Sequence, residues 1–571
     1  MHARLAQCGR PDMGNEPEQA VRPSSSAAVA VRSSFLGGAV VLVLGSLGSR
    51  VLGTTYRLVL PILMGGGRQA AVGMGLFQLA YPIFTVIVTL ITTGIPFALS
   101  KLVAEQLARG DDRAARRFFL AGRAVLPLIG LALTVVLWEL APLVARYVAR
   151  DMRVALTIRA ISPALLTISL ASAYRGAFQG MEDMVPHAAS QIVEQICRVL
   201  TMFVLVVLLL PHGIQWAAAG ASFGATVGGI GASVAMLVLW RRRASRLAPR
   251  PRRLEGPPRR DRGHRPSPLV LLRTVGAILV LAVPIAAGAT LLPLLNLADA
   301  VIVPLRLRAA GLGPEAIALY GVLTGYAAPL VLMPTIFTAA LSASLLPAVS
   351  SALASGDRRR GAGLTASGLR LSVMMILPAA TGLMLLAGPL PRLLFHSAAA
   401  AVPLRLMAPA VLFLSLQQTS SVVLQGLGRP ELPLWHLVAG GVVKVVLDWT
   451  LVANPAWNVG GAAMATTAAF AVACTLNLRA VAVRLPSAID WSGMAVRPLL
   501  ATGVMAVAVA AIQGGFLRQH PALDVAAAVP SGAAVYTMAL LAVGGVRRGD
   551  LEALPRIGPR VAASLGRLLR A

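Results

Sequence analysis

The sequence predicts an all-α polytopic membrane protein with about 14 transmembrane helices, arranged as two six-helix lobes related by an internal repeat plus two C-terminal helices. Of its 571 residues, 57% are hydrophobic and 13% are charged, with a mean hydropathy of +0.76. Soluble domains usually carry about 25% charged residues. Apolar runs recur from residue 35 to residue 546, each near the roughly 20 residues that cross a bilayer. A repeated segment is the third observation.

The expected spans follow the apolar runs in order. Proline and glycine inside several of them are compatible with membrane helices, because neighbouring helices or a cavity satisfy the freed backbone groups. The seventh span is expected to continue as a broken helix to about residue 305. The spans are 35–63, 73–99, 119–141, 154–178, 185–210, 215–240, 269–294, 317–350, 364–388, 401–425, 432–453, 458–480, 494–515 and 523–546.

Basic residues gather in alternate connections between these spans. The tails, loops and adjoining span ends on one side hold 36 of the 51 Lys and Arg, including those of 101–117, 241–268, 357–360 and the tail 547–571, which predicts that both termini are cytoplasmic in a cell membrane. The net charge of +29 is therefore attributed to topology, and no nucleic-acid partner is expected. The segment 241–268 is interpreted as a solvated basic linker, with anionic lipid head groups as the alternative partner.

The remaining regions follow from this topology. Residues 1–34 lack an apolar core followed by a cleavage site and are interpreted as a disordered cytoplasmic tail. Three cysteines show no metal or disulfide spacing, and no nucleotide-binding P-loop occurs, so no cofactor, no metal and no enzymatic activity are expected.

The repeat appears in ISPALLTISLASAYRGAFQG (161–180) and MAPAVLFLSLQQTSSVVLQG (407–426), which match at seven of twenty positions at a constant offset of 246. Six spans separate equivalent positions, so both halves have the same topology and an axis along the membrane normal relates them. The N-lobe is expected at 35–240, the C-lobe at 269–480, and two further spans at 481–546. Transporters built from paired halves bind substrate between them.

Charged residues within the spans are the candidate site residues, because such residues are costly in a membrane. Arg50 and Arg57 lie two turns apart on one face of the first span, GSLGSRVLGTTYRLVLP. We expect them to line a cavity, with snorkelling to the nearby outer surface as the alternative for Arg57. Arg175 lies near the cytoplasmic end of the fourth span, where an interfacial position is the alternative to a site role.

Three further groups carry charge. Glu194 and Arg198 are spaced i,i+4 in the fifth span, which allows a local ion pair as well as a functional one. Lys444 and Asp448 form a similar pair in the eleventh span, and Lys444 is equivalent to Arg198 in the repeat. The seventh span carries Asn296 and Asp299, followed by Arg306 and Arg308. Asp299 either neutralises an arginine of the first span or binds a coupling cation.

Bases outnumber acids within the spans, so a cavity lined by arginine would attract an anion. Guanidinium groups match phosphate oxygens bidentately. An amphiphile with a phosphate-bearing head and a long acyl or prenyl tail would fit such a site.

Several stretches resemble the polysaccharide-exporter branch of the multidrug/oligosaccharidyl-lipid/polysaccharide (MOP) exporter superfamily, within the group of stage V sporulation protein B and the lipid II flippases. They are GSLGSRVLGTTYRLVLP, GLFQLAYPIFTVIVTLITTGIPFALSKLVAE (75–105), YRGAFQGMEDMVPHAASQIVEQICRV (174–199) and LLPLLNLADAVIVPLRL (291–307). In lipid II flippases the first helix carries a pattern like SRxLGxxRD. Here Arg50 matches its first arginine, Arg57 lies one position beyond the second, and Leu58 replaces the acid.

The resemblance implies a V-shaped pair of six-helix lobes and movement of a lipid-linked oligosaccharide, such as an undecaprenyl-pyrophosphate-linked peptidoglycan precursor, across the cytoplasmic membrane. A coupling cation or the membrane potential as driving force is implied in the same way. A cation-coupled exporter of small amphiphilic drugs is the second hypothesis, disfavoured by only 5% aromatic residues. A non-transporting membrane scaffold for cell-wall synthesis enzymes is the third.

Overall fold

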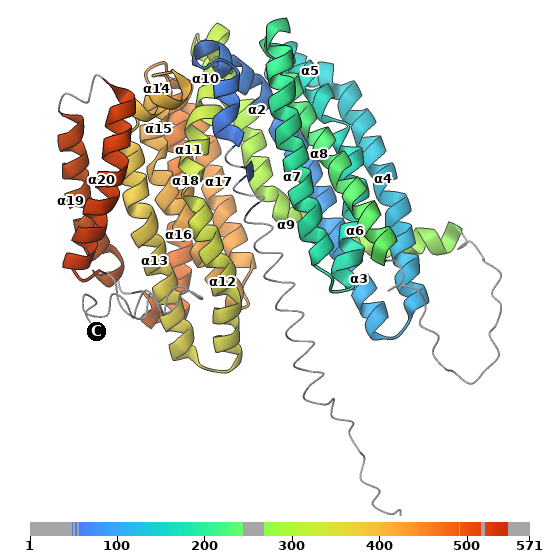
Figure 1. The fold of residues 1–571 in the computed structure, drawn as a ribbon. Coiled ribbons are helices and arrows are strands. Elements are labelled where there is room, and N and C mark those ends of the chain that lie inside the picture. Colours follow the sequence, from blue (N-terminus) through green and yellow to red (C-terminus); the bar gives the residue numbers. More distant parts are fainter. Residues whose placement is uncertain are drawn as a thin grey trace, which may run out of the picture.

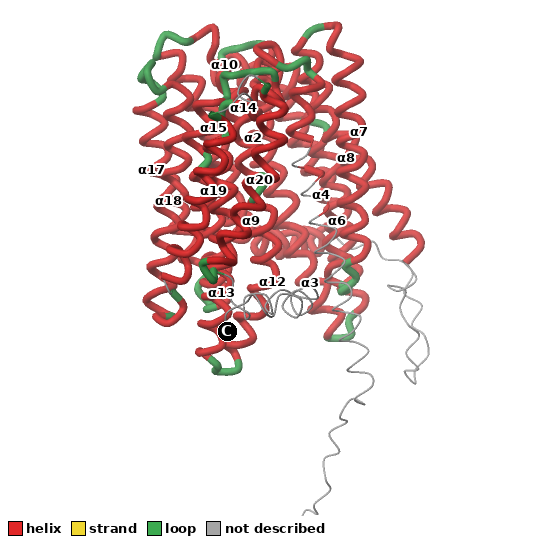
Figure 2. Tube along the Cα trace, turned by 60° about the vertical axis from the view of Figure 1, so that its left-hand side comes forward, coloured by secondary structure: helices red, strands yellow, loops and turns green. Residues whose placement is uncertain are grey.

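The computed structural model describes residues 48, 52–53, 56–243, 268–489, 492–514 and 520–545, and these are almost entirely helical (Figures 1 and 2). They contain no strand and include 14 helices long and apolar enough to cross a membrane, so the chain is a multi-pass membrane protein. The expected tail 1–34, most of the first span with Arg50, most of the basic linker and the tail 547–571 lie outside the described residues.

The first half forms one helical bundle, in which α6 packs on α3, α4 and α8, and α7 packs on α8. A π-helical turn joins α2 to α3 without interrupting the helix. The elements are α2 (Gly67–Thr89), η1 (Leu90–Gly94), α3 (Ile95–Ala108), α4 (Asp112–Leu143), η2 (Val144–Ala149), α5 (Arg153–Ile161), α6 (Ala164–Gly180), α7 (Val185–Leu209), η3 (Leu210–His212) and α8 (Ile214–Arg243).

The second half repeats this order with two more interruptions, because a turn at 386–388 separates α13 from α14 and one expected span is divided. The expected span 317–350 is two helical segments, 313–332 and 335–354, divided at Met333 and Pro334. The elements are η5 (Gly313–Glu315), α10 (Ala316–Gly321), η6 (Val322–Ala327), α11 (Ala328–Leu332), α12 (Thr335–Ala354), α13 (Arg358–Leu385), α14 (Pro389–Phe395), α15 (Ala401–Met407), α16 (Pro409–Gly426), α17 (Glu431–Leu451) and α18 (Asn458–Arg484).

The C-terminal helices α19 (Arg497–Gln513) and α20 (Pro521–Ala542) follow the short turns η7 (Pro486–Ala488) and η8 (Ser492–Val496). They form a pair at the outer flank of the second bundle, against α13 and α14 (Figure 1). The hydroxyl of Tyr536 donates to the Met374 carbonyl at 2.6 Å, which ties α20 to α13.

Helix α9 (Pro268–Ala309) connects the two bundles. The expectation of a broken seventh span is wrong, because α9 is one helix of 42 residues. Its first half packs on η1, α3 and α4, where the Ala282 carbonyl approaches Gly94. Its second half packs on α2 and α17, where Leu295 contacts Gly441. A single helix therefore touches both bundles (Figure 1).

The backbone repeats at the offset found in the sequence. Left-handed residues end equivalent helices or turns in both halves, a conformation that non-glycine residues rarely adopt. Asp111 and Asp357 cap equivalent helices, and each accepts a backbone N–H three residues later. The left-handed pairs are Gly65 and Gly311 (φ 90° and 82°), Gly110 and Gly356 (75° and 79°), Arg150 and His396 (both 52°), and Glu182 and Gly428 (59° and 74°).

The bundles meet through equivalent residues of α2 and α10. A Cβ atom on Gly75 would lie 2.1 Å from the Ile317 carbonyl oxygen, and one on Gly321 would lie 1.9 Å from that of Ala71. The Gln78 amide donates to the carbonyl of Thr324 at 3.0 Å. Among the described helices, the continuations α3 and α12 form no extensive contact with each other. The two lobes thus meet near one end, where glycine permits backbone contact.

Candidate functional site: a basic cavity and a carboxylate-lysine cluster

The first bundle contains a partly open cavity of about 400 Å³. Helix α2 and the π-helical turn η1 line one side of it, and α6 and α7 line the other. The lining residues are Tyr81, Phe84, Thr85, Val88, Thr92, Thr93, Ile168, Arg175, His187, Gln191, Glu194, Gln195 and Arg198.

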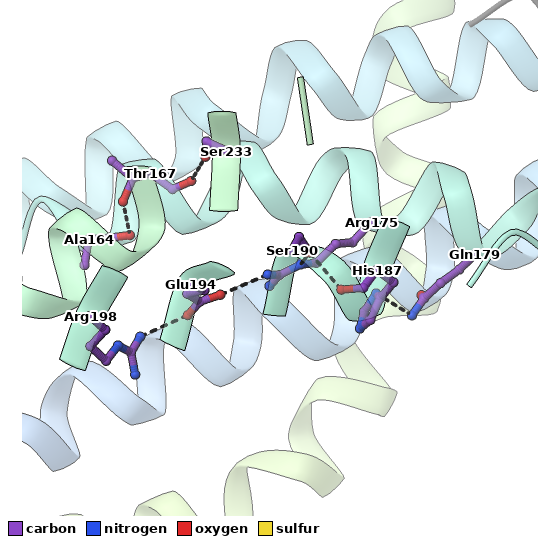
Figure 3. A network of polar contacts seen from close by, with 9 residues as sticks. All are labelled: Ala164, Thr167, Arg175, Gln179, His187, Ser190, Glu194, Arg198 and Ser233. Carbon is purple, nitrogen blue, oxygen red and sulfur yellow. Dashed lines mark hydrogen bonds and ion pairs between the residues drawn. The ribbon is translucent and has the colours of Figure 1, made fainter. Parts of the chain in front are cut away.

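Three predicted site residues form one charged network in this wall (Figure 3). Glu194 accepts from the Arg175 guanidinium at 2.9 Å and from the Arg198 guanidinium at 3.0 Å. The predicted i,i+4 ion pair of Glu194 and Arg198 is confirmed. Arg175 is 7% exposed, so it is buried between helices.

Polar neighbours fix the orientation of this network. The Arg175 Nε–H donates to the Ser190 hydroxyl at 2.9 Å, and this hydroxyl donates to the His187 carbonyl at 2.8 Å. The His187 ring lies 3.1 Å from the Gln179 amide nitrogen, at the far end of the chain of contacts in Figure 3. Arg175 is thereby held between α6 and α7.

Arg57 lies beside this cavity. Its guanidinium carbon is 5.5 Å from the centre of the Tyr81 ring, a residue of the cavity wall, and 6.0 Å from that of Tyr56. It is close enough to Arg198 for the two charges to repel. The Nε atoms of Arg57 and Arg198 are buried and have no hydrogen-bond partner among the described residues.

The electrostatic balance of this region is positive, because Arg175 and Arg198 share the single carboxylate of Glu194 and Arg57 lies nearby. Positive charge is expensive in a membrane unless something compensates it. Two buried N–H groups without acceptors add to that cost. An anionic group that enters the cavity would relieve both penalties at once.

A second charged cluster lies in the other bundle. The Lys444 ammonium is 2.9 Å from Asp299 Oδ1 and 3.1 Å from Asp448 Oδ2, and it donates to the Thr466 hydroxyl at 2.9 Å. Helices α9, α17 and α18 each contribute. Lysine has three N–H donors, and all three are used here. The predicted pair of Lys444 and Asp448 is confirmed.

Of the other predicted residues, Asp299 belongs to the second cluster, and Asn296 and Arg306 lie outside both. In the described part of the chain, Asp299 forms its ion pair with Lys444 and not with Arg57 of the first span. Asn296 is exposed on α9. The Arg306 Nε–H donates to the Trp449 carbonyl at 2.8 Å, and the Arg306 guanidinium stacks on the Trp449 ring. This contact lies at the end of α9 away from the cavity. Arg50 lies outside the described residues.

Residue-type reasoning missed the uncharged part of the wall. Tyr81, Thr85 and Thr92 recur at near-helical spacing on one side of α2 and η1, and His187 and Gln191 precede Glu194 on α7. The signal was available as polar residues at i, i+4 spacing within an apolar run. The predicted site residues were chosen mainly for their charge, so these uncharged polar residues were not included.

Comparison with known families agrees with this architecture. The family model described as "Polysaccharide biosynthesis protein" matches residues 35–353, and the MatE model matches residues 284–450. The solved structure of the lipid II flippase MurJ in an inward closed conformation superposes with a TM-score of 0.63 at 14% identity, covering 88% of this chain and 98% of that one. An inward-facing MATE family transporter of the MOP superfamily gives 0.58 at 15% identity, covering 76% and 98%.

Two proteins of Bacillus subtilis (strain 168) are similar in sequence. Stage V sporulation protein B is 27% identical over 528 residues, which is 92% of this chain and 99% of that protein. The lipid II flippase MurJ is 29% identical over 437 residues, which is 74% of this chain and 78% of that protein. With a family model matching more than half of its residues, this chain belongs to the polysaccharide biosynthesis protein family.

Proposed function

We propose that this protein is a flippase that moves a lipid-linked oligosaccharide, built on an undecaprenyl-pyrophosphate carrier, across the bacterial cytoplasmic membrane by alternating access. Similarity to a lipid II flippase over 74% of the chain supports the substrate class. The observation that carries the proposal is the basic cavity of the first bundle, which Arg175, Arg198 and their shared carboxylate Glu194 line, with Arg57 beside it.

The cavity suits a pyrophosphate better than a cationic drug. Arg198 and Arg57 each keep a buried Nε–H without an acceptor among the described residues. Phosphate oxygens accept from such groups in charge-assisted hydrogen bonds, which are about twice as strong as neutral ones. Glu194 holds Arg175 and Arg198 in fixed positions, so little side-chain entropy remains to be lost on binding.

The hydroxyls and amides of the wall suit a sugar head group. Thr85, Thr92 and Gln191 line the same cavity as the arginines. Sugars are recognised by several hydrogen bonds from such side chains, whereas the prenyl tail needs only the surrounding lipid. A cavity of about 400 Å³ holds part of a large head group, so the sugar would extend into the space between the lobes.

The contact of α2 with α10 supplies a pivot for alternating access. Equivalent glycines let two backbones touch there, and side chains of both halves form shared apolar clusters around that point, which hold the halves together while their other ends separate. In transporters with paired halves, one half rocks against the other around a central site. We place both termini, and the basic segments between the lobes, on the cytoplasmic side.

The test uses the purified protein in liposomes that contain a fluorescent undecaprenyl-pyrophosphate disaccharide. A membrane-impermeant quencher reports how much of the label reaches the outer leaflet. Arg198→Gln removes the guanidinium group and its charge. We expect the flipping rate to fall by about 10- to 100-fold, which corresponds to the free energy of one hydrogen bond to a charged group. Arg198→Lys keeps the charge but cannot form two parallel hydrogen bonds, so its flipping rate should lie between those of the wild type and Arg198→Gln.

Arg484→Gln is the matched control, because Arg484 is a solvent-facing arginine that donates to the Ala480 carbonyl. It should flip lipid at the wild-type rate. Full activity of Arg198→Gln would contradict the proposal. Binding and export of a cationic dye with no flipping would favour a small-molecule exporter. Complementation of a flippase-depleted strain by Arg198→Gln would favour a scaffold for cell-wall synthesis enzymes.

A further inference from the structure

His187 adds an imidazole to the wall of the basic cavity. It is half-buried, near the start of α7, and follows the short turn that joins α6 to α7. The side-chain amide nitrogen of Gln179, near the end of α6, lies 3.1 Å from its Nδ1 (Figure 3). An amide nitrogen only donates hydrogen bonds, so Nδ1 accepts here and the ring proton lies on Nε2. In this arrangement His187 is a neutral imidazole.

The turn between α6 and α7 does not need this pair of side chains. The Asp183 backbone N–H donates to the Phe178 carbonyl at 3.0 Å and closes the turn. In the second half, the Arg429 N–H donates to the Leu424 carbonyl at the same distance of 3.0 Å. The same turn therefore forms at the equivalent place in both halves of the chain.

The histidine belongs only to the half that has the basic cavity. In the second half, Gln425 occupies the position of Gln179 but is exposed, and Pro433 occupies the position of His187. Since the backbone turn is the same with proline, a purely structural role does not require the imidazole. Its place in the cavity wall points instead to a role toward a ligand.

The charges that act on the His187 ring are mainly positive. The guanidinium of Arg175 on α6 has the larger influence, and the Glu194 carboxylate on α7 has the smaller one. Glu194 is also paired with two arginines, so it compensates little of the positive charge. The other ionisable groups on the surrounding elements lie in the cavity wall or in the turn before α7, and they are Tyr81, Arg198, Glu182 and Asp183. A proton on His187 would therefore add a further cation to a basic site within a membrane, which is costly.

An anionic head group in the cavity would reverse this balance. Phosphate oxygens beside the ring favour the imidazolium form, because an opposite charge nearby stabilises a charged group. Histidine is suited to this change, since its ordinary pKa lies close to neutral pH. For Nδ1 to carry a proton, the Gln179 amide must turn over and present its oxygen, which is the acceptor of the same group.

We propose that His187 is a further binding residue of the pyrophosphate site, and that it takes up one proton when the head group enters the cavity. The proton comes from the aqueous solution and forms the Nδ1–H bond. Gln179 then accepts from this N–H through its amide oxygen, and Nε2–H donates to a phosphate oxygen. The cavity thus carries the additional cation only while an anion is bound. This inference rests on the proposed flippase function, because it needs a pyrophosphate ligand.

Titration calorimetry of the full-length protein in detergent measures this proton uptake directly. The probe is a short-chain prenyl-pyrophosphate disaccharide, whose two phosphates are strongly acidic diesters, so its own charge does not change near neutral pH. The heat of binding in buffers with different ionisation enthalpies gives the number of protons exchanged. We expect uptake of up to about one proton per ligand, and an affinity that rises by up to about tenfold for each unit by which the pH falls.

Three variants assign the proton. His187→Gln should bind the probe without proton uptake and with an affinity that no longer depends on pH. Gln179→Glu supplies a carboxylate that keeps the imidazole protonated before the ligand arrives, so binding should persist while uptake is lost. His212→Gln is the matched control, because His212 is an exposed histidine just after the other end of α7, and it should keep the wild-type uptake. A merely structural role of His187 would lower the affinity of His187→Gln at every pH and leave its pH dependence unchanged.

The outcomes separate this inference from the proposed function. Binding without proton uptake in the wild-type protein, or the same uptake in His187→Gln, overturns the role of His187 and leaves the flippase function standing. No binding of the probe to the wild-type protein overturns the pyrophosphate site and the role of His187 together. Proton-linked binding by a protein that flips no lipid in liposomes would support the role of His187 and contradict the flippase function. If His187→Gln fails to fold, Gln179→Glu and the wild-type pH dependence decide.

Discussion

Arg198 and Lys444 occupy the same position in the two halves, 246 residues apart, in opposite surroundings. Arg198 shares the single carboxylate of Glu194 with Arg175, beside a cavity. Lys444 contacts two carboxylates, those of Asp299 and Asp448, and the hydroxyl of Thr466. The repeat thus preserved a buried base on one helix, while the number of acids around it diverged between the halves.

This difference decides what each base can bind. All three donors of Lys444 are used, so it has none left for a ligand. Arg198 keeps a buried Nε–H without an acceptor among the described residues. The proposed anion site therefore fits the first bundle, where guanidinium groups outnumber carboxylates, whereas the second cluster has no unused donor for an anion.

The largest expected effect comes from removing the cation of the second cluster. Lys444→Met leaves Asp299 and Asp448 facing each other without a base, and breaking a buried pair by removing one partner costs about 3–5 kcal/mol. We expect the thermal unfolding temperature of the protein in detergent to fall accordingly. Measurement by tryptophan fluorescence or light scattering would record this fall.

Two further variants sharpen that result. Lys444→Met combined with Asp448→Asn removes the surplus charge as well, and it should recover a large part of the lost stability. Lys444→Arg keeps the charge and should lose less than Lys444→Met. Unchanged stability of Lys444→Met alone would show that the two aspartates are already neutral in the folded protein, so Lys444 would not be their required counter-ion.

A second prediction concerns the contact between the halves. Gly75→Ala together with Gly321→Ala places two Cβ atoms about 2 Å from opposing carbonyl oxygens, at 2.1 and 1.9 Å. Overpacking of this kind costs about 1–3 kcal/mol per site, and separating α2 from α10 relieves it. Spin labels at the exposed positions 68 and 315 should therefore report a longer distance between the lobes.

Gly503→Ala is a suitable control for this pair, because a Cβ there meets nothing within 4 Å. It should leave the distance distribution unchanged. The same distribution in the double glycine variant would show that the backbones can slide past the added methyl groups without separating. Flipping would then have to rely on movement elsewhere.

Much of this architecture was predictable from the sequence, because the apolar runs indicate the membrane helices and the repeat indicates that the two halves have the same topology. The offset of 246 carried over to the left-handed residues and to the caps Asp111 and Asp357, since glycine and aspartate at helix ends are local signals. The pairs of Glu194 with Arg198 and Lys444 with Asp448 were also local, because both are spaced by one helical turn.

What the sequence did not show depends on contacts between distant helices. Asp299 meets Lys444 because α9 packs on α17, and no spacing rule connects residues so far apart in the chain. Arg175 reaches Glu194 across the interface of α6 and α7. A break was expected in the seventh span, whereas α9 is continuous and packs on helices of both bundles.

The smallest predicted effect compares two equivalent turns outside the spans. Asp151 and Ser397 lie 246 residues apart, and each accepts the backbone N–H two residues later. Only Asp151 adds an ion pair, with Arg153 at 2.7 Å. Partial burial raises the pKa of the Asp151 carboxyl, but the hydrogen bonds and charge of Arg153 outweigh it and hold this pKa below its usual value.

The direction of the resulting pH dependence follows from that shift. Because the folded pKa is lowered, the ion pair stabilises the protein above the pKa of the unfolded state, and this contribution is lost as the pH falls through the folded pKa. Arg153 is largely exposed, so the gain is at most about 1 kcal/mol. Asp151→Asn keeps the backbone acceptor and removes only the charge. Its unfolding temperature should lie slightly below that of the wild type at neutral pH and converge with it in acid, whereas Ser397→Ala should show the same small difference at both pH values. A gap between Asp151→Asn and the wild type that does not change with pH would mean that the turn, and not the ion pair, distinguishes this loop from its counterpart.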